Sequence, residues 1–438
     1  MISNSICDLE ISLVSEIAAD LPSSVVREIR DIISWRCSHE PNWYQHPGRT
    51  VMYQSREFNR IIKIKGAGFY NPPNVADSGL KRTIVPVPES HLPLPPLQST
   101  FQRDLIHVDP DRSPPYALTS VQSFPAPVGG MLLKTALNDR AMFERLNRSG
   151  VPANSSVAVF RYDRLKLDDL PMGVSVSALP AGTLPQTPYD IYLDWTMGDR
   201  DRRLGDLENL GAQICNNRQF SMLSPANRLD LVARLGRIAG KTILEFSTKA
   251  GLYRFSGSPD NFSLRLNPRS PLYLSDVDTA DTLESIDPPQ QAWEVLRNLL
   301  TAIHQWLYFF LPSLSDPDSG YTWELLREYD FIAELLAGFF PHADRSQIEV
   351  AAAKIWAAVE PVRQHLPNPI PLRGGEYLLQ RHCPRPLFYL IALEATIDLV
   401  QGSAVQQTFA AADTSSIGIG NYIVNSAKHP SHQQFFPT

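Results

Sequence analysis

The sequence predicts an α+β protein with a small strand-containing N-terminal part and a large, mainly helical C-terminal part. Strand patterns occur within residues 49–65, where isoleucines alternate with Lys63 and Lys65. Beyond about residue 205, long segments repeat apolar residues at the spacing of a helix. The 438 residues, 43% of them hydrophobic, allow a large core, divided among two or three domains or between the lobes of one bilobal unit.

The N-terminal half divides into segments of different character. Residues 1–48 are expected to form a helical extension. Residues 49–200 hold the strands, and within them residues 71–130 are so rich in proline that we expect a long insertion. A strong helix is predicted over 131–149, followed by a strand at SSVAVFRYDRL and a short strand at DIYLDW.

The C-terminal part, residues 201–438, is predicted to be mainly helical. The segment SPANRLDLVARLGRIAGKTILEFSTKAG is typical of one long helix, with Ser224 as its N-cap. A turn and a strand are expected within 251–280. Further helices are then predicted at PPQQAWEVLRNLLTAIHQWLYFFL, YTWELLREYDFIAELLAGFF, DRSQIEVAAAKIWAAVEPVRQHL and RPLFYLIALEATIDLVQ.

Composition argues against a nucleic-acid or membrane partner. The 40 basic and 46 acidic residues are mixed along the chain and give a net charge of −6. The longest apolar run is too short to span a bilayer, and the N-terminus lacks the basic region of a secretory signal. The four cysteines form no CxxC pair, so the sequence indicates neither a zinc site nor a disulfide framework. Unpaired cysteines favour a cytoplasmic location. A secreted effector with a non-cleaved signal would have the same composition.

Oxygen-bearing side chains gather in two neighbouring places of the C-terminal half. Asp260 and Asn261 stand side by side in the small-residue turn SGSPDN. Asp276 and Asp278 come directly after the predicted strand at LYL. Carboxylate and amide oxygens are the ligands that Mg²⁺ prefers, with phosphates and water completing its coordination. The two segments therefore predict the two sides of one metal site, although the same residues are also common in plain turns and caps.

A basic strand end supplies the complementary charge. Lys65 ends its predicted strand and is followed by Gly66 and Gly68, and a glutamate in the 131–149 helix, Glu144, is available to hold it. Lys63 lies on the same strand face, and Asp139 lies earlier on the same helix, so both pairings stay open. A held lysine, a magnesium ion and charge neutralisation are the minimal equipment of phosphoryl or nucleotidyl transfer.

Four islands of sequence resemble the selenoprotein O family, kinase-fold enzymes that transfer AMP to protein hydroxyls. NRIIKIKGAG resembles the Lys-Gly-Ser/Ala-Gly strand of that family. ERLNRSGVPANSSVAV is similar to its glutamate-containing helix and the strand that follows. GLYRFSGSPDNFS is similar to its Asp-Asn loop, after which LYLSDVD takes the place of the metal-binding Asp motif of kinases. The resemblance is confined to these islands.

The resemblance implies a protein-kinase-like bilobal fold, with a small β-containing N-lobe and a large helical C-lobe, that uses ATP and Mg²⁺. It implies that Lys65, or Lys63, contacts the nucleotide phosphates beside Gly66 and Gly68, and that Glu144 pairs with the lysine. It further implies that Asn261 and Asp276 hold Mg²⁺, that Asp260 accepts the hydroxyl proton, and that Asp278 serves a second metal ion or the structure.

Two departures keep other functions open. Arg254 replaces the family's loop histidine, and VSVSALPAGTLPQ contains none of the arginines that grip the nucleotide in the family. A kinase that phosphorylates a protein, peptide or small molecule is therefore the first alternative, and a pseudokinase scaffold is the second. In ordinary kinases the catalytic Asp stands where this chain has Ser256. The sequence indicates neither the acceptor nor the oligomeric state.

Overall fold

The computed structural model describes residues 10–34, 44, 50–55, 57–67, 69–70, 82–83, 85–87, 104–108, 116–120, 126–128, 130–167, 169–193, 204–286, 288–315, 319–364, 383, 385–400 and 402–403. The chain is α+β and forms two compact units. The first unit comprises Met1–Ser99, Gln122–Pro185 and Tyr273–Ala280, and the second comprises Thr100–Val121, Gln186–Leu272 and Asp281–Thr438. The short segment Tyr273–Ala280, which lies far along the chain, thus packs with the N-terminal residues.

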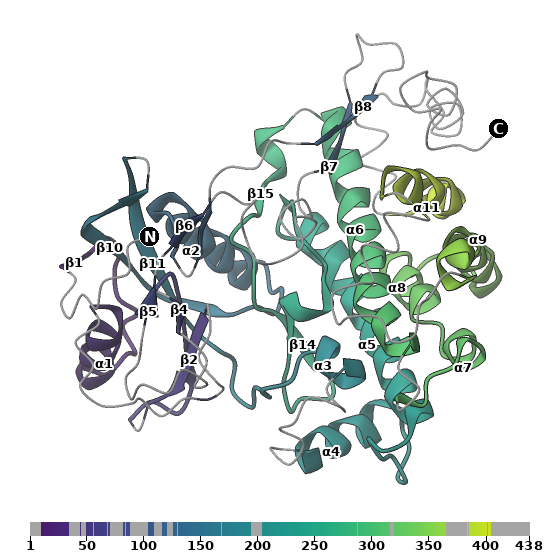
Figure 1. Cartoon of the computed structure of the whole chain (residues 1–438), viewed down its shortest axis with the longest axis horizontal. Helices are drawn as coiled ribbons and strands as arrows, with labels where there is room; N and C mark the ends of the chain where they lie inside the picture. The colour runs from purple at the N-terminus through teal and green to yellow at the C-terminus, as the bar shows by residue number, and fades with distance from the viewer. Residues whose placement is uncertain are drawn as a thin grey trace. The chain divides into compact units, whose positions relative to one another are not determined.

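A five-stranded antiparallel sheet organises the first unit (Figure 1). Its strands, in spatial order, are β1 (Ile11–Leu13), β10 (Ser155–Leu167), β11 (Leu170–Ala178), β3 (Ile61–Lys65) and β2 (Thr50–Gln54). The predicted strands in 49–65 and at SSVAVFRYDRL are therefore confirmed. β3 lies inside the sheet, where Lys65 stands opposite Ser175 on one neighbour and Thr50 on the other.

The two faces of this sheet differ because side chains of a strand alternate in direction. Ile62 and Ile64 of β3 pack in one hydrophobic core with α1 (Ser23–Ile33), which contributes Val25 and Ile29. Lys63 and Lys65 point to the opposite face, where α2 (Leu133–Arg148) packs through Ala136. One face is thus a hydrophobic core, and the other combines apolar packing with buried polar groups.

The structure corrects two predictions about secondary structure. The described part of residues 1–48, which is 10–34 and 44, is not helical throughout, because β1 pairs with β10, and α1 belongs to the core of the sheet. The predicted strand DIYLDW is wrong, since Pro188–Leu193 forms a short helix, α3. Asp190 explains this helix: its carboxylate accepts hydrogen bonds from the backbone N–H and the hydroxyl of Thr187, as in a capping box.

The described strands of the proline-rich segment, together with β4 just before it, are short and pair in an antiparallel way. β4 (Phe69–Tyr70) pairs with β5 (Arg82–Thr83), β6 (Val85–Val87) with β9 (Ala126–Val128), and β7 (Asp104–Val108) with β8 (Tyr116–Ser120). The predicted insertion therefore contains strands that its composition did not indicate. The rest of 71–129 lies outside the described residues, as does Gly68.

Helices make up most of the described second unit, as predicted. Besides α3, they are α4 (Leu204–Ile214), α5 (Pro225–Thr248), α6 (Pro288–Ser315), α7 (Trp323–Glu328), α8 (Phe331–Phe339), α9 (Arg345–Gln364) and α11 (Arg385–Val400). The Ser224 hydroxyl caps α5 by accepting from the N–H of Asn227, as expected. The helix predicted over 321–340 is broken into α7 and α8, because Asp330 caps a new helix by accepting from Ala333.

Glycines allow a close contact between two helices of the second unit. α5 and α8 lie side by side (Figure 1), and a Cβ atom built on Gly240 of α5 would lie 2.1 Å from the Leu335 carbonyl oxygen. A Cβ atom on Gly338 of α8 would lie 1.9 Å from the Arg237 carbonyl oxygen. The two backbones approach each other as closely as they do because neither position carries a side chain.

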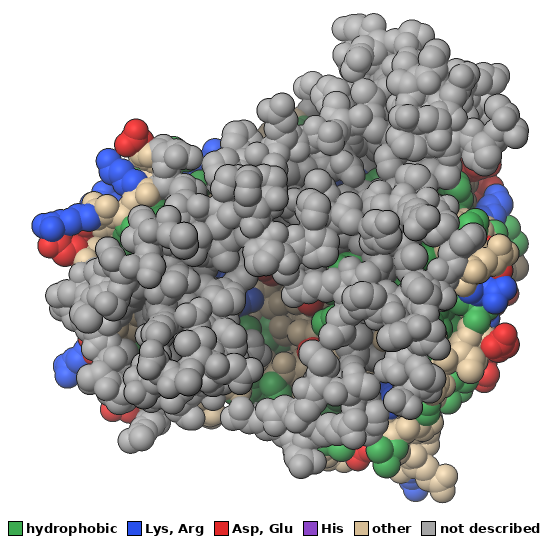
Figure 2. All heavy atoms as spheres, in the orientation of Figure 1, with side chains coloured by type: hydrophobic (Ala, Val, Ile, Leu, Met, Phe, Trp, Pro, Cys, Tyr) green, Lys and Arg blue, Asp and Glu red, His purple; other side chains and the backbone are tan. Residues whose placement is uncertain are grey.

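Shorter elements follow α5 in the chain. β12 (Leu252–Tyr253) pairs with β15 (Asp281–Thr282), and between them lie the 3₁₀ turn Pro259–Asn261, β13 (Phe262–Leu264) and β14 (Leu272–Leu274). A second 3₁₀ turn, Leu283–Ser285, precedes α6. Among the described helices, none combines the length and the apolar character that crossing a bilayer requires. On the face shown in Figure 2, described basic and acidic side chains lie interspersed.

Candidate functional site

A lysine surrounded by three carboxylates lies within the first unit. The Nζ atom of Lys65 is 2.6 Å from Asp276 Oδ1, 3.4 Å from Asp139 Oδ1 and 3.5 Å from Asp278 Oδ2. The side chains of Lys65 and Asp139 are 8% and 1% exposed, whereas those of Asp276 and Asp278 are 38% and 24% exposed. We call these four residues the Lys65 cluster. It is buried on the sheet side and opens to solvent at its two later aspartates.

Three separate elements bring the Lys65 cluster together. Lys65 ends β3, Asp139 lies on the sheet-facing side of α2, and the remaining two aspartates follow β14. Backbone hydrogen bonds fix the end of β14, because the N–H of Leu274 donates to the Pro152 carbonyl and its own carbonyl accepts from Asn154. The predicted meeting of Lys65 and Asp276 therefore occurs, although 211 residues separate them.

The carboxylates determine the charge of Lys65. Burial alone would lower the pKa of this ammonium, but the charges of Asp139, Asp276 and Asp278 outweigh burial and raise it well above its usual value. For Asp276, burial would raise the pKa, but the ammonium groups of Lys65 and Lys63 outweigh it and lower the pKa. Lys65 and Asp276 therefore form a fully ionised pair at neutral pH.

Asp278 of the cluster and the neighbouring Lys63 have pKa values shifted away from ionisation. Burial, and then the charge of Asp276, raises the pKa of Asp278 to about 6. Burial, and then the charge of Lys65, lowers the pKa of Lys63 to about 8. Two neighbouring carboxylates that resist joint ionisation form a place where an added cation would be stabilised.

Asp139, and not Glu144, is the helical partner of Lys65. Glu144 pairs with Arg140 at 2.7 Å and is 44% exposed, so the expected Lys65–Glu144 pair is replaced by the alternative pair with Asp139. The reason is helical geometry: five positions rotate a side chain by roughly 140° around the axis, which takes Glu144 off the face that meets the sheet. Sequence spacing alone did not indicate which face would be buried.

Ser175 is a site residue that the sequence analysis missed. Its hydroxyl donates a 2.6 Å hydrogen bond to Asp139 Oδ2 and so leaves Oδ1 directed at Lys65. The signal was present in the alternation of GVSVSA, where Val174 and Val176 join the hydrophobic core. Ser175 and Ser177 are then placed on the polar face of β11, beside the strand that carries Lys65.

Gly66 turns the chain immediately after Lys65. It adopts φ +92°, and a Cβ atom at this position would lie 2.6 Å from the Gly173 carbonyl oxygen and 2.9 Å from Met131 Cβ. Only glycine fits both the dihedral angle and the space. The structure thus gives Gly66 a backbone role, and its contact with a nucleotide stays a prediction.

Asp260 and Asn261 belong to the second unit. Both lie in the 3₁₀ turn, where the Ser258 hydroxyl donates to the Asp260 carboxylate and Asn261 Nδ2 donates to the Ser256 carbonyl oxygen at 2.9 Å. Arg254 has φ +61° and packs over the Tyr253 ring. The roles of Asp260 as base and Asn261 as metal ligand stay predictions.

The donor set of the Lys65 cluster suits Mg²⁺ bound together with phosphates. Among the described residues, no group of three or more His, Cys, Asp and Glu side chains is arranged to hold a metal ion by itself. Asp276 and Asp278 offer two partly exposed carboxylates at one edge of the site. Protein sites for Mg²⁺ commonly supply one or two carboxylates and leave the remaining positions to phosphates and water.

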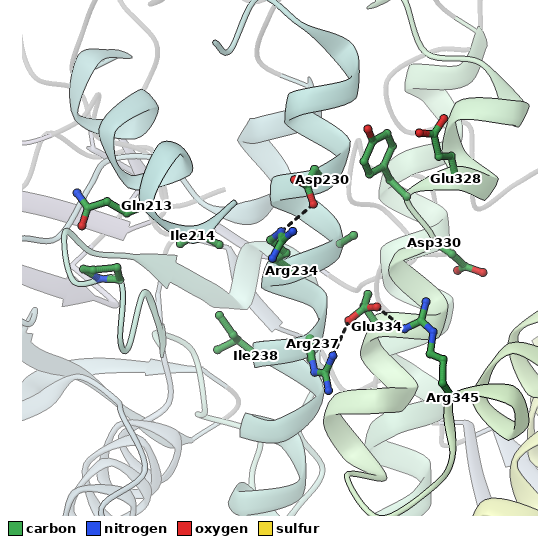
Figure 3. Close-up of a pocket in the computed structure, with 13 residues that line it drawn as sticks. Gln213, Ile214, Asp230, Arg234, Arg237, Ile238, Glu328, Asp330, Glu334 and Arg345 are labelled. Carbon is green, nitrogen blue, oxygen red and sulfur yellow. Dashed lines mark hydrogen bonds and ion pairs between the residues drawn. The ribbon is translucent and has the colours of Figure 1, made fainter. Parts of the chain in front are cut away.

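A pocket of about 460 Å³ lies elsewhere, within the second unit, and contains none of the predicted site residues. Figure 3 shows that Arg234 of α5 points toward Asp230, while Glu334 of α8 lies between Arg237 and Arg345. Each of these arginines is thus paired with a carboxylate of the same pocket. The pocket is a charged hollow whose charges largely compensate one another.

Comparisons with known proteins give no relative on which to base a function. A scan against protein-family models found none that matches the chain, and a search of curated proteins found no significant match.

Proposed function

We propose that the chain is a Mg²⁺- and ATP-dependent transferase with a protein-kinase-like bilobal fold, which transfers AMP to a hydroxyl group of a protein or peptide. The observation that carries the proposal is the ion pair between Lys65 and Asp276, two residues singled out separately as a phosphate contact and a metal ligand. Asp139 and Ser175 complete a held lysine at the end of an inner strand. The resemblance to selenoprotein O supplies the type of group transferred.

The residues divide the chemistry among themselves. Lys65 neutralises phosphate charge, and Asp139 keeps its ammonium on the sheet face that meets α2. Asp276 and Asn261 would hold Mg²⁺, which when bound neutralises the charge of the phosphates. Asp260 accepts the proton of the acceptor hydroxyl as its oxygen bonds to the α-phosphorus and the bond to pyrophosphate breaks.

The position of a radioactive label in ATP tests this function directly. The protein is incubated with Mg²⁺ and with ATP labelled at the α- or at the γ-phosphate. Candidate acceptor proteins are added in one set of reactions, and in another the protein itself is the only acceptor. Covalent α-label is the expected result. Covalent γ-label would replace AMP transfer by kinase activity, and the absence of both labels, together with no thermal stabilisation by ATP, would favour a pseudokinase scaffold.

Substitutions in the Lys65 cluster connect the label to the site. Asp276→Asn should lower labelling roughly a hundredfold or more, because a metal ligand and the partner of Lys65 are both lost. Asp139→Asn should lower it more than Glu144→Gln, because Asp139 contacts Lys65 and Glu144 contacts Arg140. Full labelling by Asp276→Asn would contradict the metal assignment, and a larger loss for Glu144→Gln would reverse the choice of helical partner.

A further inference from the structure

The carbonyl group of Ser275, the residue before Asp276, is held by two buried side chains. Lys63 Nζ donates to this oxygen at 2.6 Å, and Asn154 Nδ2 lies 3.4 Å from it. Lys63 is 6% exposed and Asn154 is fully buried. Lys63 was an expected alternative contact for nucleotide phosphates, but its ammonium is directed at the protein backbone.

The backbone is anchored on both sides of Asp276, so the Ser275 carbonyl determines how the backbone between the two anchors is oriented. Upstream, Leu274 is fixed by its backbone hydrogen bonds to Pro152 and Asn154. Downstream, the amide of Asn138 donates to the carbonyl oxygens of Asp278 at 3.0 Å and Ala280 at 2.7 Å. Between these anchors, the Ser275 carbonyl sets the direction of the peptide unit from which the Asp276 side chain emerges.

The position of Lys63 is costly for the fold, which argues for more than space filling. A buried ammonium next to a second ammonium loses hydration and is repelled, and burial followed by the charge of Lys65 is what lowers its pKa. An apolar side chain would fill the same space without either cost. The hydrogen bond to Ser275 is the interaction that only a donor at this position can supply.

We propose that Lys63 and Asn154 are positioning residues, which fix the carbonyl of Ser275 and thereby orient the Asp276 carboxylate for metal binding. The functional half of this inference rests on the proposed Mg²⁺–ATP site. The structural half, that the two donors hold the segment 274–280, does not. Lys63 therefore acts through Asp276, whereas Lys65 acts on the phosphates themselves.

Two measurements on the full chain test the two halves separately. Hydrogen exchange of the peptide covering 274–280, without ligand, measures the hold on the segment. Thermal-shift titrations measure ATP binding without metal and the Mg²⁺ concentration that gives half of the additional stabilisation. The first variant is Lys63→Met, whose side chain is of similar length but has no hydrogen-bond donor. The second is Asn154→Asp, which places an acceptor against the Ser275 carbonyl. Lys134→Met, at an exposed position of α2, is the matched control.

We expect Lys63→Met and Asn154→Asp to speed exchange in 274–280 and to raise the Mg²⁺ requirement about tenfold, with ATP binding in the absence of metal changed less than about twofold. Lys63→Arg, which keeps a charged donor, should restore most of the wild-type metal requirement. Lys65→Met should instead weaken ATP binding both with and without metal. Lys134→Met should match the wild type in all measurements.

The remaining outcomes separate the inference from the proposed function. Unchanged exchange in 274–280 overturns the inference, and so does faster exchange with an unchanged Mg²⁺ requirement. If the wild type binds neither ATP nor Mg²⁺–ATP, the proposed function fails. Faster exchange in the Lys63→Met and Asn154→Asp variants would then show that the two residues hold segment 274–280, but not that they position a metal ligand. If Lys63→Met does not fold, Asn154→Asp decides by the same criteria.

Discussion

At the scale of single residues, the Lys65 cluster combines attraction with unresolved repulsion. Lys65 neutralises the charge of Asp276, which lies 2.6 Å away. Asp278, another carboxylate of the cluster, lies 3.5 Å from the same ammonium and is also partly buried. Burial and the charge of Asp276 make its ionised form unfavourable. Functional sites often hold such groups at a cost to stability. A bound cation would remove the cost of the ionised Asp278 carboxylate.

Asp278→Asn should therefore stabilise the protein in a pH-dependent way. The folded-state pKa of about 6 lies above the value of 3.8 for an unperturbed Asp, so the folded state favours the protonated carboxyl. Ionisation lowers stability as pH rises through this window, and the cost is full above about pH 6. We expect Asp278→Asn to raise the free energy of unfolding by about 3 kcal/mol at pH 7.5 and by nearly nothing below about pH 4.

Urea denaturation of Asp278→Asn at several pH values measures this difference, with Asp20→Asn at an exposed position of the first unit as the control. A difference that is constant across pH, or that grows toward acid, would show that the ionised Asp278 is not the unfavourable group.

At the scale of elements, periodic patterns predicted what they directly encode. The alternation in β3 gave its two faces, the apolar spacing gave α2 and α5, and Ser224 gave the start of α5. Local hydrogen bonding decided the failures: Asp190 turned an expected strand into α3, and Asp330 broke an expected helix. Each of these capping hydrogen bonds involves only a few residues. The apolar pattern is judged over a longer segment of sequence, so it does not reveal them.

The contact of α5 with α8 gives a prediction at this scale. Gly240→Ala and Gly338→Ala should each lower the free energy of unfolding by about 1–3 kcal/mol, because each new methyl group meets a carbonyl oxygen of the facing helix. Gly205→Ala in α4 has no atom within 4 Å of the added Cβ and should be neutral or slightly stabilising. Chemical denaturation of the three variants measures this, and equal stabilities would rule out a tight α5–α8 contact.

At the scale of the whole molecule, burial controls the chemistry of the described cysteines. Cys215 and Cys383 carry free thiols that are 7% and 1% exposed. Burial raises the pKa of both to about 12, with the charge of Asp230 adding to the effect at Cys215. Cys7 and Cys37 lie outside the described residues. The thiolate, which is the reactive form, is therefore scarce at Cys215 and Cys383 in the folded protein.

Alkylation should accordingly report folding. At pH 8 we expect iodoacetamide to modify Cys215 and Cys383 at least about a hundredfold more slowly in the folded protein than in urea. Mass spectrometry of the peptides containing each cysteine measures the two rates. Prompt modification of either residue in the folded protein would mean that its surroundings open easily.

The sequence by itself determined the residue types of the candidate site and the faces of the elements that carry them. Strand alternation placed Lys63 and Lys65 on one face, and composition placed carboxylates directly after a strand, because both are local properties. Only the tertiary structure decided that Asp139 meets Lys65, that Ser175 holds Asp139, and that Lys63 faces the Ser275 carbonyl. Those pairings depend on how α2 and the end of β14 pack against the sheet, and contacts between distant parts of the chain set that packing.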